Sequence, residues 1–261
     1  DTVPGDIFVT VLPCWHIFQR TAEYFVLSRA GCLVYSDKKH FRADLLQHKP
    51  HILVGVPRLF ENLYNSVISK TTQSATTSKF VRNLVSFLML VSYLFVYAKR
   101  TALDRSLEAS DSRSALLRFA RKVRSAVVMV VLWPLYSIAN VLVWKKVREG
   151  VGGRVKEIIC GGGRLAMMQE DFFEAAGLNI FVGYGLTETS PVICNRFAER
   201  CVRGSAGLPP PGTQVCVVDV EDEEKMREID ANENRPGLIM VRGPQVTKGY
   251  WKNPEATRKA F

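Results

Sequence analysis

The segment from Val155 to Pro191, VKEIICGGGRLAMMQEDFFEAAGLNIFVGYGLTETSP, indicates the fold class of this chain. Its apolar start, Val155 to Cys160, is typical of a buried strand and ends in the glycine turn Gly161 to Gly163. The next stretch, Leu165 to Ala176, has apolar residues at helical spacing, and Asn179 to Val182 is again strand-like. A strand, a helix and a strand in this order predict a mostly parallel sheet covered by helices.

The amino-terminal part repeats this alternation of strands and helices. Strand-like runs lie at Ile7 to Leu12, Cys32 to Tyr35 and His51 to Val54. Helical patterns lie between them, at Phe18 to Ala30 and Arg42 to His48. We therefore expect these strands to join the same α/β sheet.

The pattern changes after Cys201. Proline and glycine become frequent, and the two strand-like runs Gln214 to Val220 and Leu238 to Arg242 predict an antiparallel β subdomain. A last helix is expected to begin at Asn253 and Pro254. The predicted parts are α/β in 1–69, a basic and apolar helical insertion in 70–150, a glycine-rich α/β part in 151–200 and the β subdomain in 201–261.

The positive charge of the chain lies in one segment. The 261 residues carry 35 Lys and Arg against 25 Asp and Glu, a net charge of +10. The segment 70–156 alone holds 16 basic and 4 acidic residues, a net +12, so the remainder sums to −2. Basic residues bracket two uncharged apolar runs, 83–98 and 125–144, a pattern that favours an anionic membrane surface over nucleic acid as partner.

The length of these runs bears on whether they cross a membrane. The first has 16 uncharged residues, and the second reaches 20 only by including Pro134 and Asn140. A spanning helix needs about 20 apolar residues. We expect amphipathic or re-entrant helices, and buried core helices of an insertion remain the alternative.

The sequence gives no sign of a zinc site or of a signal peptide. The six cysteines form no C-x-x-C pair and have no histidines at finger spacing, so free thiols are expected and a zinc site is not. Residues 1–13 lack the basic start, apolar stretch and small-residue cleavage site of a signal peptide.

The two glycine-rich turns carry the chemistry. At strand ends, glycines allow a nucleotide to approach the backbone and expose N–H groups to phosphate. Around the second turn, Tyr184 offers a flat face for a purine, Thr187 a hydroxyl for a phosphate oxygen and Glu188 a carboxylate suited to Mg²⁺. This combination predicts a nucleotide site.

These residues carry a specific resemblance. GYGLTETSP, Gly183 to Pro191, resembles the central motif of the adenylate-forming enzymes, the superfamily of acyl-CoA synthetases, luciferases and peptide-synthetase adenylation domains. Four further segments agree in order: LPCWH at Leu12 to His16, VPRLFENLY at Val56 to Tyr64, GLPPPG at Gly207 to Gly212 and VRGPQVTKGYWKNPEAT at Val241 to Thr257. The chain is most similar to the plant plastid long-chain acyl-carrier-protein synthetases and their acyl-CoA synthetase relatives.

The resemblance implies that the chain corresponds to the central part of the large N-terminal domain of such an enzyme. It also implies which residues form the site. Those implied to bind the nucleotide are Gly161, Gly162, Gly163, Gly183, Tyr184, Gly185, Leu186 and Thr187. Glu188 would hold Mg²⁺ and act with Thr187 in catalysis, and His16 would lie beside the acyl carboxylate.

The resemblance further implies a fragment of an ATP-dependent long-chain fatty-acid ligase. Such an enzyme forms an acyl-adenylate and then a thioester with CoA or with the phosphopantetheine of acyl-carrier protein. A membrane-associated plastid location is expected, with the endoplasmic reticulum or another intracellular membrane as alternative. A noncatalytic, membrane-associated fatty-acid or nucleotide-binding relative remains the second reading, and a nucleic-acid binder the weakest.

Several features depart from the family pattern. The phosphate loop that precedes the Leu-Pro-x-x-His motif, and the C-terminal lid domain with its catalytic lysine, do not lie within residues 1–261. Arg164, Leu238 and Gln19 replace residues that are usual in relatives. We expect the 261-residue chain by itself to lack ligase activity.

Overall fold

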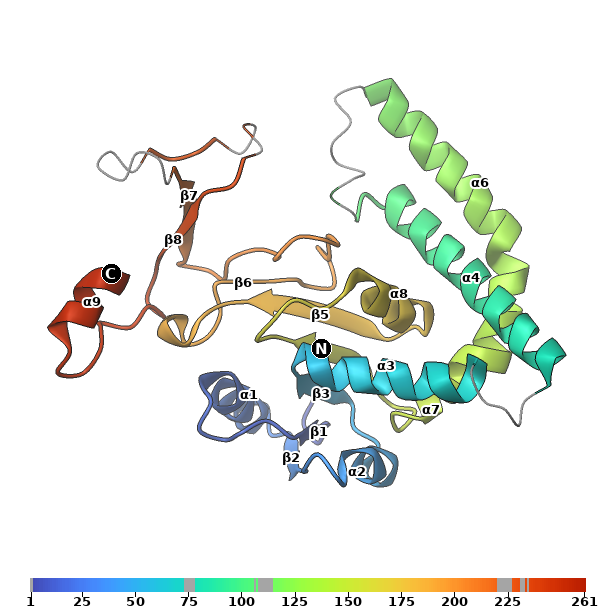
Figure 1. Ribbon diagram of the computed structural model, residues 1–261, viewed down its shortest axis with the longest axis horizontal. Coiled ribbons are helices and arrows are strands. Elements are labelled where there is room, and N and C mark those ends of the chain that lie inside the picture. The colour runs from blue at the N-terminus through green and yellow to red at the C-terminus, as the bar shows by residue number, and fades with distance from the viewer. Residues whose placement is uncertain are drawn as a thin grey trace.

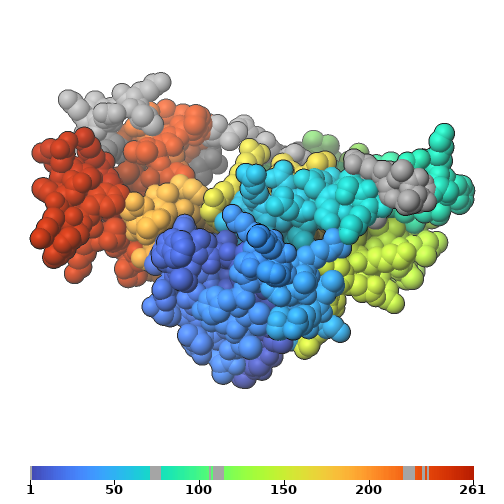
Figure 2. Space-filling view, turned by 60° about the horizontal axis from the view of Figure 1, so that its bottom comes forward, coloured from blue at the N-terminus to red at the C-terminus, as the bar shows by residue number. Residues whose placement is uncertain are grey.

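The computed structural model describes residues 2–72, 78–105, 107, 115–219, 227–230, 233 and 235–261. Figure 1 shows a central α/β body, with a pair of long helices on one side and a small β arm with a terminal helix on the other. The space-filling view in Figure 2 places the C-terminal arm and the helical insertion at opposite ends of this body.

A six-stranded sheet forms the body, in the order β2-β1-β3-β4-β5-β6. Its strands are β1 (Ile7–Thr10), β2 (Cys32–Tyr35), β3 (Ile52–Gly55), β4 (Glu157–Cys160), β5 (Asn179–Tyr184) and β6 (Cys194–Asn195). The first five are parallel, and only β6 pairs antiparallel, along β5. The predicted mostly parallel α/β sheet is confirmed.

Alternate strand residues fill two cores on opposite faces of the sheet. Phe8 and Ile52 pack into one apolar cluster, with Val26 of α1 (Ile17–Ser28). Val9 and Leu53, one residue further along the same strands, pack into a larger cluster on the other face. Because successive side chains of a strand point to opposite faces, uninterrupted apolar runs such as β3 become buried on both sides.

The larger core is made by the helices that follow β2, β3 and β4. These are α2 (Phe41–His48), α3 (Pro57–Thr72) and α8 (Met167–Ala175). Phe172 of α8 is 1% exposed, and its ring meets those of Tyr64, Phe173 and Trp144 edge-on at 5.0 to 5.5 Å. Such edge-to-face contacts add to the area burial of a core.

The C-terminal part is an antiparallel arm, as expected. Strands β7 (Gln214–Val218) and β8 (Leu238–Arg242) pair in a two-stranded sheet. The predicted first strand ended at Val220, which lies outside the described residues. Helix α9 (Pro254–Ala260) is capped by Asn253, whose side chain accepts from the Ala256 N–H at 3.0 Å.

The insertion folds into two long antiparallel helices. Helix α4 (Lys79–Ala102) packs against α8 on its inner side, and α6 (Ala115–Ala139) packs along α4. A π-helical turn, Asn140–Trp144, and α7 (Lys145–Glu149) carry α6 back to the body. The two apolar runs, 83–98 and 125–144, thus lie within two adjacent helices.

Burial distinguishes these two helices. Helix α4 and the continuous helical segment Ala115–Glu149, which begins with α6, are long and apolar enough, by length and composition alone, to cross a membrane. However, 33% of the most apolar window of α4 is buried, against only 11% of that of the second segment. On α4, Leu88, Met89, Val91, Phe95 and Val96 are buried against the body. The buried-core alternative therefore describes the inner side of both helices, since Met129, Leu132 and Tyr136 of α6 also pack against the larger core, but it leaves most of α6 exposed.

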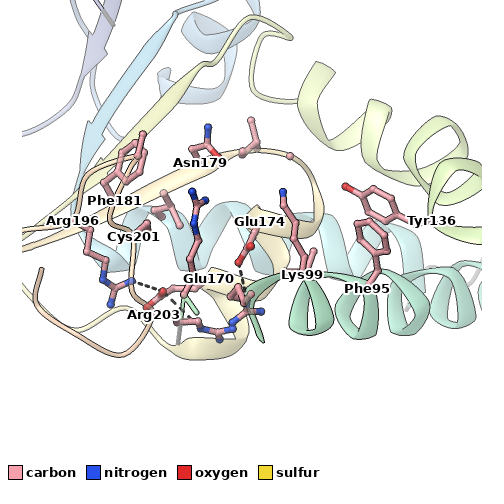
Figure 3. Close-up of a pocket in the computed structure, with 17 residues that line it drawn as sticks. Phe95, Lys99, Tyr136, Glu170, Glu174, Asn179, Phe181, Arg196, Cys201 and Arg203 are labelled. Carbon is pink, nitrogen blue, oxygen red and sulfur yellow. Dashed lines mark hydrogen bonds and ion pairs between the residues drawn. The ribbon is translucent and has the colours of Figure 1, made fainter. Parts of the chain in front are cut away.

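A cluster of buried ion pairs fastens α4 to α8 and to the segment that follows β6 (Figure 3). Arg100 of α4 and Arg203 both contact Asp171 of α8. Next to them Arg196 donates to Glu170 at 2.7 Å. The cluster lines a cavity of about 310 Å³ between α4, α8 and β5. Three arginines share three carboxylates here, because Arg100 also pairs with Glu174 at 3.0 Å. The three guanidinium groups are almost fully buried, so these carboxylates compensate charge that water barely reaches.

The variant Glu170→Gln is expected to lower the free energy of unfolding by about 3 kcal/mol, because it leaves the buried Arg196 guanidinium without its counter-charge. Urea denaturation followed by circular dichroism measures this loss. The matched control is Glu255→Gln, which breaks an exposed pair with Lys259 and should change stability little. Equal effects of the two variants would contradict a structural role for the cluster.

A second polar cluster lies at the amino-terminal ends of β1, β3 and β4. His51 is 8% exposed, and its Nδ1 accepts the Ile7 N–H at 2.9 Å. Asp6 lies 3.3 Å from the same ring and pairs with Lys156 at 3.0 Å. Burial, together with the Arg154 guanidinium beside the ring, lowers the pKa of His51 below 6.5. The ring is therefore neutral in the folded protein near pH 7.

Stability should fall as the pH drops below 6.5 toward the lowered pKa of folded His51, because in that window the unfolded chain binds the proton more readily. Guanidinium denaturation at a series of pH values measures the slope. The exposed His40 has its pKa raised by Asp37 and contributes the opposite slope, so the measurement is made with His40→Gln. In that protein, adding His51→Gln should flatten the slope, and an unchanged slope would refute the assignment.

Candidate active site

The strand register brings the two predicted glycine turns to one edge of the sheet. Cys160, the last residue of β4, pairs with Val182 of β5, so Gly161 lies level with Gly183, one residue before β5 ends at Tyr184. Gly161 also donates its N–H to the Gly55 carbonyl at the end of β3, at 3.1 Å. Because these parallel strands end together, their turns face one shared site, where open α/β sheets place ligands.

The first glycine turn is packed tightly against α1. A Cβ on Gly161 would stand 3.1 Å from the ring of Phe18, and Gly162 has a φ of +78°, which favours glycine. Phe18 is the second residue of α1, so this contact brings the start of that helix beside the turn. The Leu-Pro-x-x-His motif and the glycine motif are thereby neighbours in space.

His16 caps the start of α1 at this edge. Its Nδ1 accepts the Phe18 N–H at 3.2 Å, and the side chain is exposed. A neutral imidazole that accepts at Nδ1 carries its proton on Nε2. His16 can therefore present one N–H donor to a ligand at the sheet edge.

Gln19, the departure from the family pattern on α1, lies inside the protein. It is fully buried, its Oε1 accepts from the Thr10 hydroxyl and its Nε2 donates to Glu23 at 3.0 Å. These bonds satisfy its amide group. Gln19 therefore ties α1 to the end of β1 and does not reach the open edge.

The second glycine turn allows no side chain at its last position. A Cβ on Gly185 would lie 1.6 Å from the Pro191 carbonyl oxygen, which is an impossible contact. The preceding residue, Tyr184, keeps 38% of its surface exposed at the end of β5, and its carbonyl accepts the Ile193 N–H at 2.9 Å. The close return of the chain thus fixes Tyr184 with its ring accessible to a ligand.

The Thr-Glu-Thr turn separates a structural threonine from outward side chains. Thr189 is buried, and its hydroxyl bonds to both the N–H and the carbonyl of Leu186 at 3.0 Å. Thr187 and the Leu186 side chain are exposed, and Glu188 is partly exposed. The cap made by Thr189 leaves the Thr187 hydroxyl and the Glu188 carboxylate directed to the solvent side of the turn.

The structure adds Tyr250 to this site. Its hydroxyl donates to Glu188 Oε1 at 2.6 Å, and the Thr247 N–H donates to the Glu188 carbonyl at 2.8 Å. The same hydroxyl holds the pKa of Glu188 below its usual value of 4.5. The sequence motif around Tyr250 was recognised, but no local pattern indicated that its ring reaches a residue 62 positions earlier.

Glu188 fits a magnesium ion that is shared with a nucleotide. In the described part of the chain no three His, Cys, Asp or Glu side chains gather as a metal site. Mg²⁺ usually binds through one or two carboxylates together with substrate phosphates, and keeps several waters. One ionised, accessible carboxylate beside two backbone turns is therefore a suitable donor set for Mg²⁺ on a nucleotide, and unsuitable for a metal held by protein alone.

Replacing Tyr250 by Phe should raise the pKa of Glu188 toward its usual 4.5, because the hydrogen bond that favours the ionised carboxylate is lost. NMR titration of a chain with ¹³C-labelled glutamate carboxyls, with Glu188→Gln to assign the signal, measures the change. Trp251→Phe removes the neighbouring, 88% exposed ring and is the matched control. A Glu188 titration that is the same in both variants would show that Tyr250 does not hold the carboxylate.

The parallel sheet, its paired glycine turns and the accessible carboxylate are the arrangement expected of an α/β unit that binds its ligand at the carboxyl ends of the strands. The sequence matches the AMP-binding enzyme family over residues 1–251. This chain therefore belongs to the AMP-binding enzyme family.

Comparisons with individual proteins agree with this family. Long-chain-fatty-acid–acyl-carrier-protein ligase AEE15, chloroplastic, from Arabidopsis thaliana is 36% identical over 258 residues, covering 98% of this chain and 34% of that protein. Long-chain-fatty-acid–CoA ligase FadD15 from Mycobacterium bovis is 29% identical, covering 98% of this chain and 36% of its own length. The chain thus spans about a third of the length of these relatives.

The fold has solved counterparts. The N-terminal domain of FACL13 from Mycobacterium tuberculosis superposes with a TM-score of 0.57 at 17% identity, covering 100% of this chain and 46% of that one. At this identity the likeness concerns the fold. It confirms the expected fold, a mostly parallel α/β sheet followed by a small antiparallel sheet.

Proposed function

We propose that this chain forms the nucleotide-binding centre of an ATP-dependent ligase that activates a long-chain fatty acid as its acyl-adenylate and then transfers the acyl group to a thiol. The observation that supports it most is the strand register that aligns Gly161 with Gly183, beside the turn that carries Glu188. The names of the curated relatives support the acid and the thiol-ester product. They also favour a ligase over a noncatalytic binding relative.

The chemical task is to bring two anions together. When a carboxylate attacks the α-phosphorus of ATP, the bond to the β-phosphate breaks and pyrophosphate leaves. Negative charge gathers on the phosphate oxygens during this step and must be neutralised. The backbone N–H groups of the two glycine turns and the Thr187 hydroxyl would provide hydrogen bonds, and the ring of Tyr184 would stack on adenine. Mg²⁺ bound to Glu188 would supply the remaining positive charge.

No general base is needed for the first step, because a fatty-acid carboxylate is already ionised near pH 7. The Nε2–H of His16 would donate a hydrogen bond to this carboxylate and orient it for attack. The second step is attack of a thiol on the acyl-adenylate, with AMP as leaving group. The acceptor would be CoA or the phosphopantetheine of acyl-carrier protein, since relatives of both kinds match the chain.

We place the enzyme at a membrane surface in the plastid. A long-chain acid partitions into lipid, and the exposed apolar surface of α6 supports the membrane association. The plastid location is supported by two chloroplastic relatives at 36% and 35% identity. The endoplasmic reticulum or another intracellular membrane is the alternative location.

Pyrophosphate exchange with palmitate, ATP and Mg²⁺ tests the proposal in a protein that carries residues 1–261 together with their flanking reading frame. We expect palmitate-dependent exchange, and its reduction by at least about a hundredfold in Glu188→Gln. The 261-residue chain alone should not support exchange. Thioester formation with CoA and with acyl-carrier protein then identifies the acceptor.

Glu199→Gln, which changes an exposed glutamate eleven positions further along, is the control for lost negative charge. Absence of exchange in a folded, ATP-binding protein would favour the noncatalytic reading. Full activity of Glu188→Gln would remove the metal role from this residue.

A further inference from the structure

The outward side of α6 is a continuous apolar stripe. Apart from the adjacent Val130 and Val131, its residues are separated by three, four or seven positions, as expected for one face of a helix. The stripe consists of Leu116, Phe119, Val123, Val127, Val130, Val131, Ile138 and Val141, all of which are 47% to 76% exposed. Ser125, Ala139 and Val143 lie on the opposite side and are buried. Because every one of these side chains is at least 47% exposed, the stripe is larger than scattered surface hydrophobics and marks an interaction site.

Basic side chains stand at both ends of the stripe. Arg118 and Arg124 are exposed near its start, and Lys145 and Lys146 are exposed just beyond its end. Between Ser125 and Trp144 there is no charged residue. A helix with an apolar centre and cationic ends suits an anionic lipid surface, where the centre enters the acyl region and the ends meet the headgroups.

Packing decides the orientation of this helix relative to a membrane. Its uncharged run is long enough to cross, at about 1.5 Å per residue. However, α6 lies along α4, and α4 lies on α8, where Arg100 pairs with Asp171 and Glu174. A spanning α6 would carry these ions to the depth of the hydrocarbon, which is costly. An α6 parallel to the surface leaves them in the body of the protein.

We propose that the α6 stripe binds an anionic lipid surface with the helix lying in the membrane plane, so that the chain is a monotopic protein attached from one side. This refines the membrane association on which the proposed function relies, and it is tested without ligase chemistry. Pairing of two stripes from two copies is disfavoured, because it would bring two segments of net charge +12 together.

Co-sedimentation of the 261-residue chain with vesicles is the first test. We expect binding to vesicles of phosphatidylglycerol and phosphatidylcholine, weaker binding to phosphatidylcholine alone, and partial release by salt. The double variant Val130→Glu/Val131→Glu changes two side chains that are 75% and 67% exposed, and should lower partitioning by about tenfold or more. Leu46→Glu on α2, which is 46% exposed and remote from the stripe, is the matched control.

Depth-dependent quenching separates an in-plane helix from a spanning one. Trp133 lies in the middle of the uncharged run and is 61% exposed, whereas Trp144 is buried. With the exposed Trp15 and Trp251 replaced by Phe, lipids brominated near the glycerol end should quench Trp133 most. Strongest quenching by bromines near the bilayer centre would overturn the proposal in favour of a spanning helix.

Light scattering and circular dichroism complete the test. Light scattering shows whether the chain forms a dimer, and circular dichroism shows whether the glutamate variant is folded. If the original chain is a dimer, and the folded variant is a monomer that still binds vesicles equally well, the stripe binds a second copy and the proposal is wrong. Should the glutamate variant unfold, Val130→Ser/Val131→Ser provides a milder version of the same comparison. The lipid-binding proposal would also be wrong if the stripe variant and the Leu46 variant bound vesicles equally well, or if the folded chain did not bind vesicles at all. These outcomes do not depend on the result of the pyrophosphate exchange assay.

Discussion

Parallel pairing of β1, β2, β3, β4 and β5 is the constraint on which the rest of this structure depends. Parallel strands need crossover connections, and both faces of the resulting sheet must be covered. The crossovers provide α1 on one face and α2, α3 and α8 on the other, over two separate apolar cores. The same pairing ends the strands together, so the turns after β4 and β5 meet at one edge. Core and site therefore have a common cause.

The remaining parts attach to this sheet by a few specific contacts. The β arm reaches the site through Thr247 and Tyr250, which bond to the main chain and side chain of Glu188. The long helices attach through the buried arginine cluster and the inner side of α4. Both attachments use charged or polar groups in defined geometry, whereas the outer side of α6 has apolar groups directed to solvent. The apolar side chains near α8 are therefore covered by protein, whereas those on the outer side of α6 remain exposed to solvent.

Much of the architecture could be predicted because its signals are local. Uninterrupted apolar runs in the strands, helical spacing and glycine or asparagine at element ends each act within a few residues. The helix after the glycine turn begins at Met167, two positions later than its apolar spacing suggested, since Leu165 already packs in the core before the helix starts. The apolar runs 83–98 and 125–144 were equally consistent with core and surface helices. Apolar side chains favour removal from water, but their composition does not tell whether protein or another apolar surface buries them.

The sequence by itself determined the alternation of strands and helices, the two glycine turns and the residue types available for nucleotide chemistry, since each follows from side-chain size, backbone freedom or charge at short range. Only the tertiary structure decided which residues meet. It set Phe18 against Gly161, Tyr250 against Glu188 and Arg100 against Asp171, pairs separated by 62 to 143 positions. It also decided that the inner side of α4 is covered by α8 while most of α6 is left exposed, because coverage depends on which surfaces the sheet brings together in space.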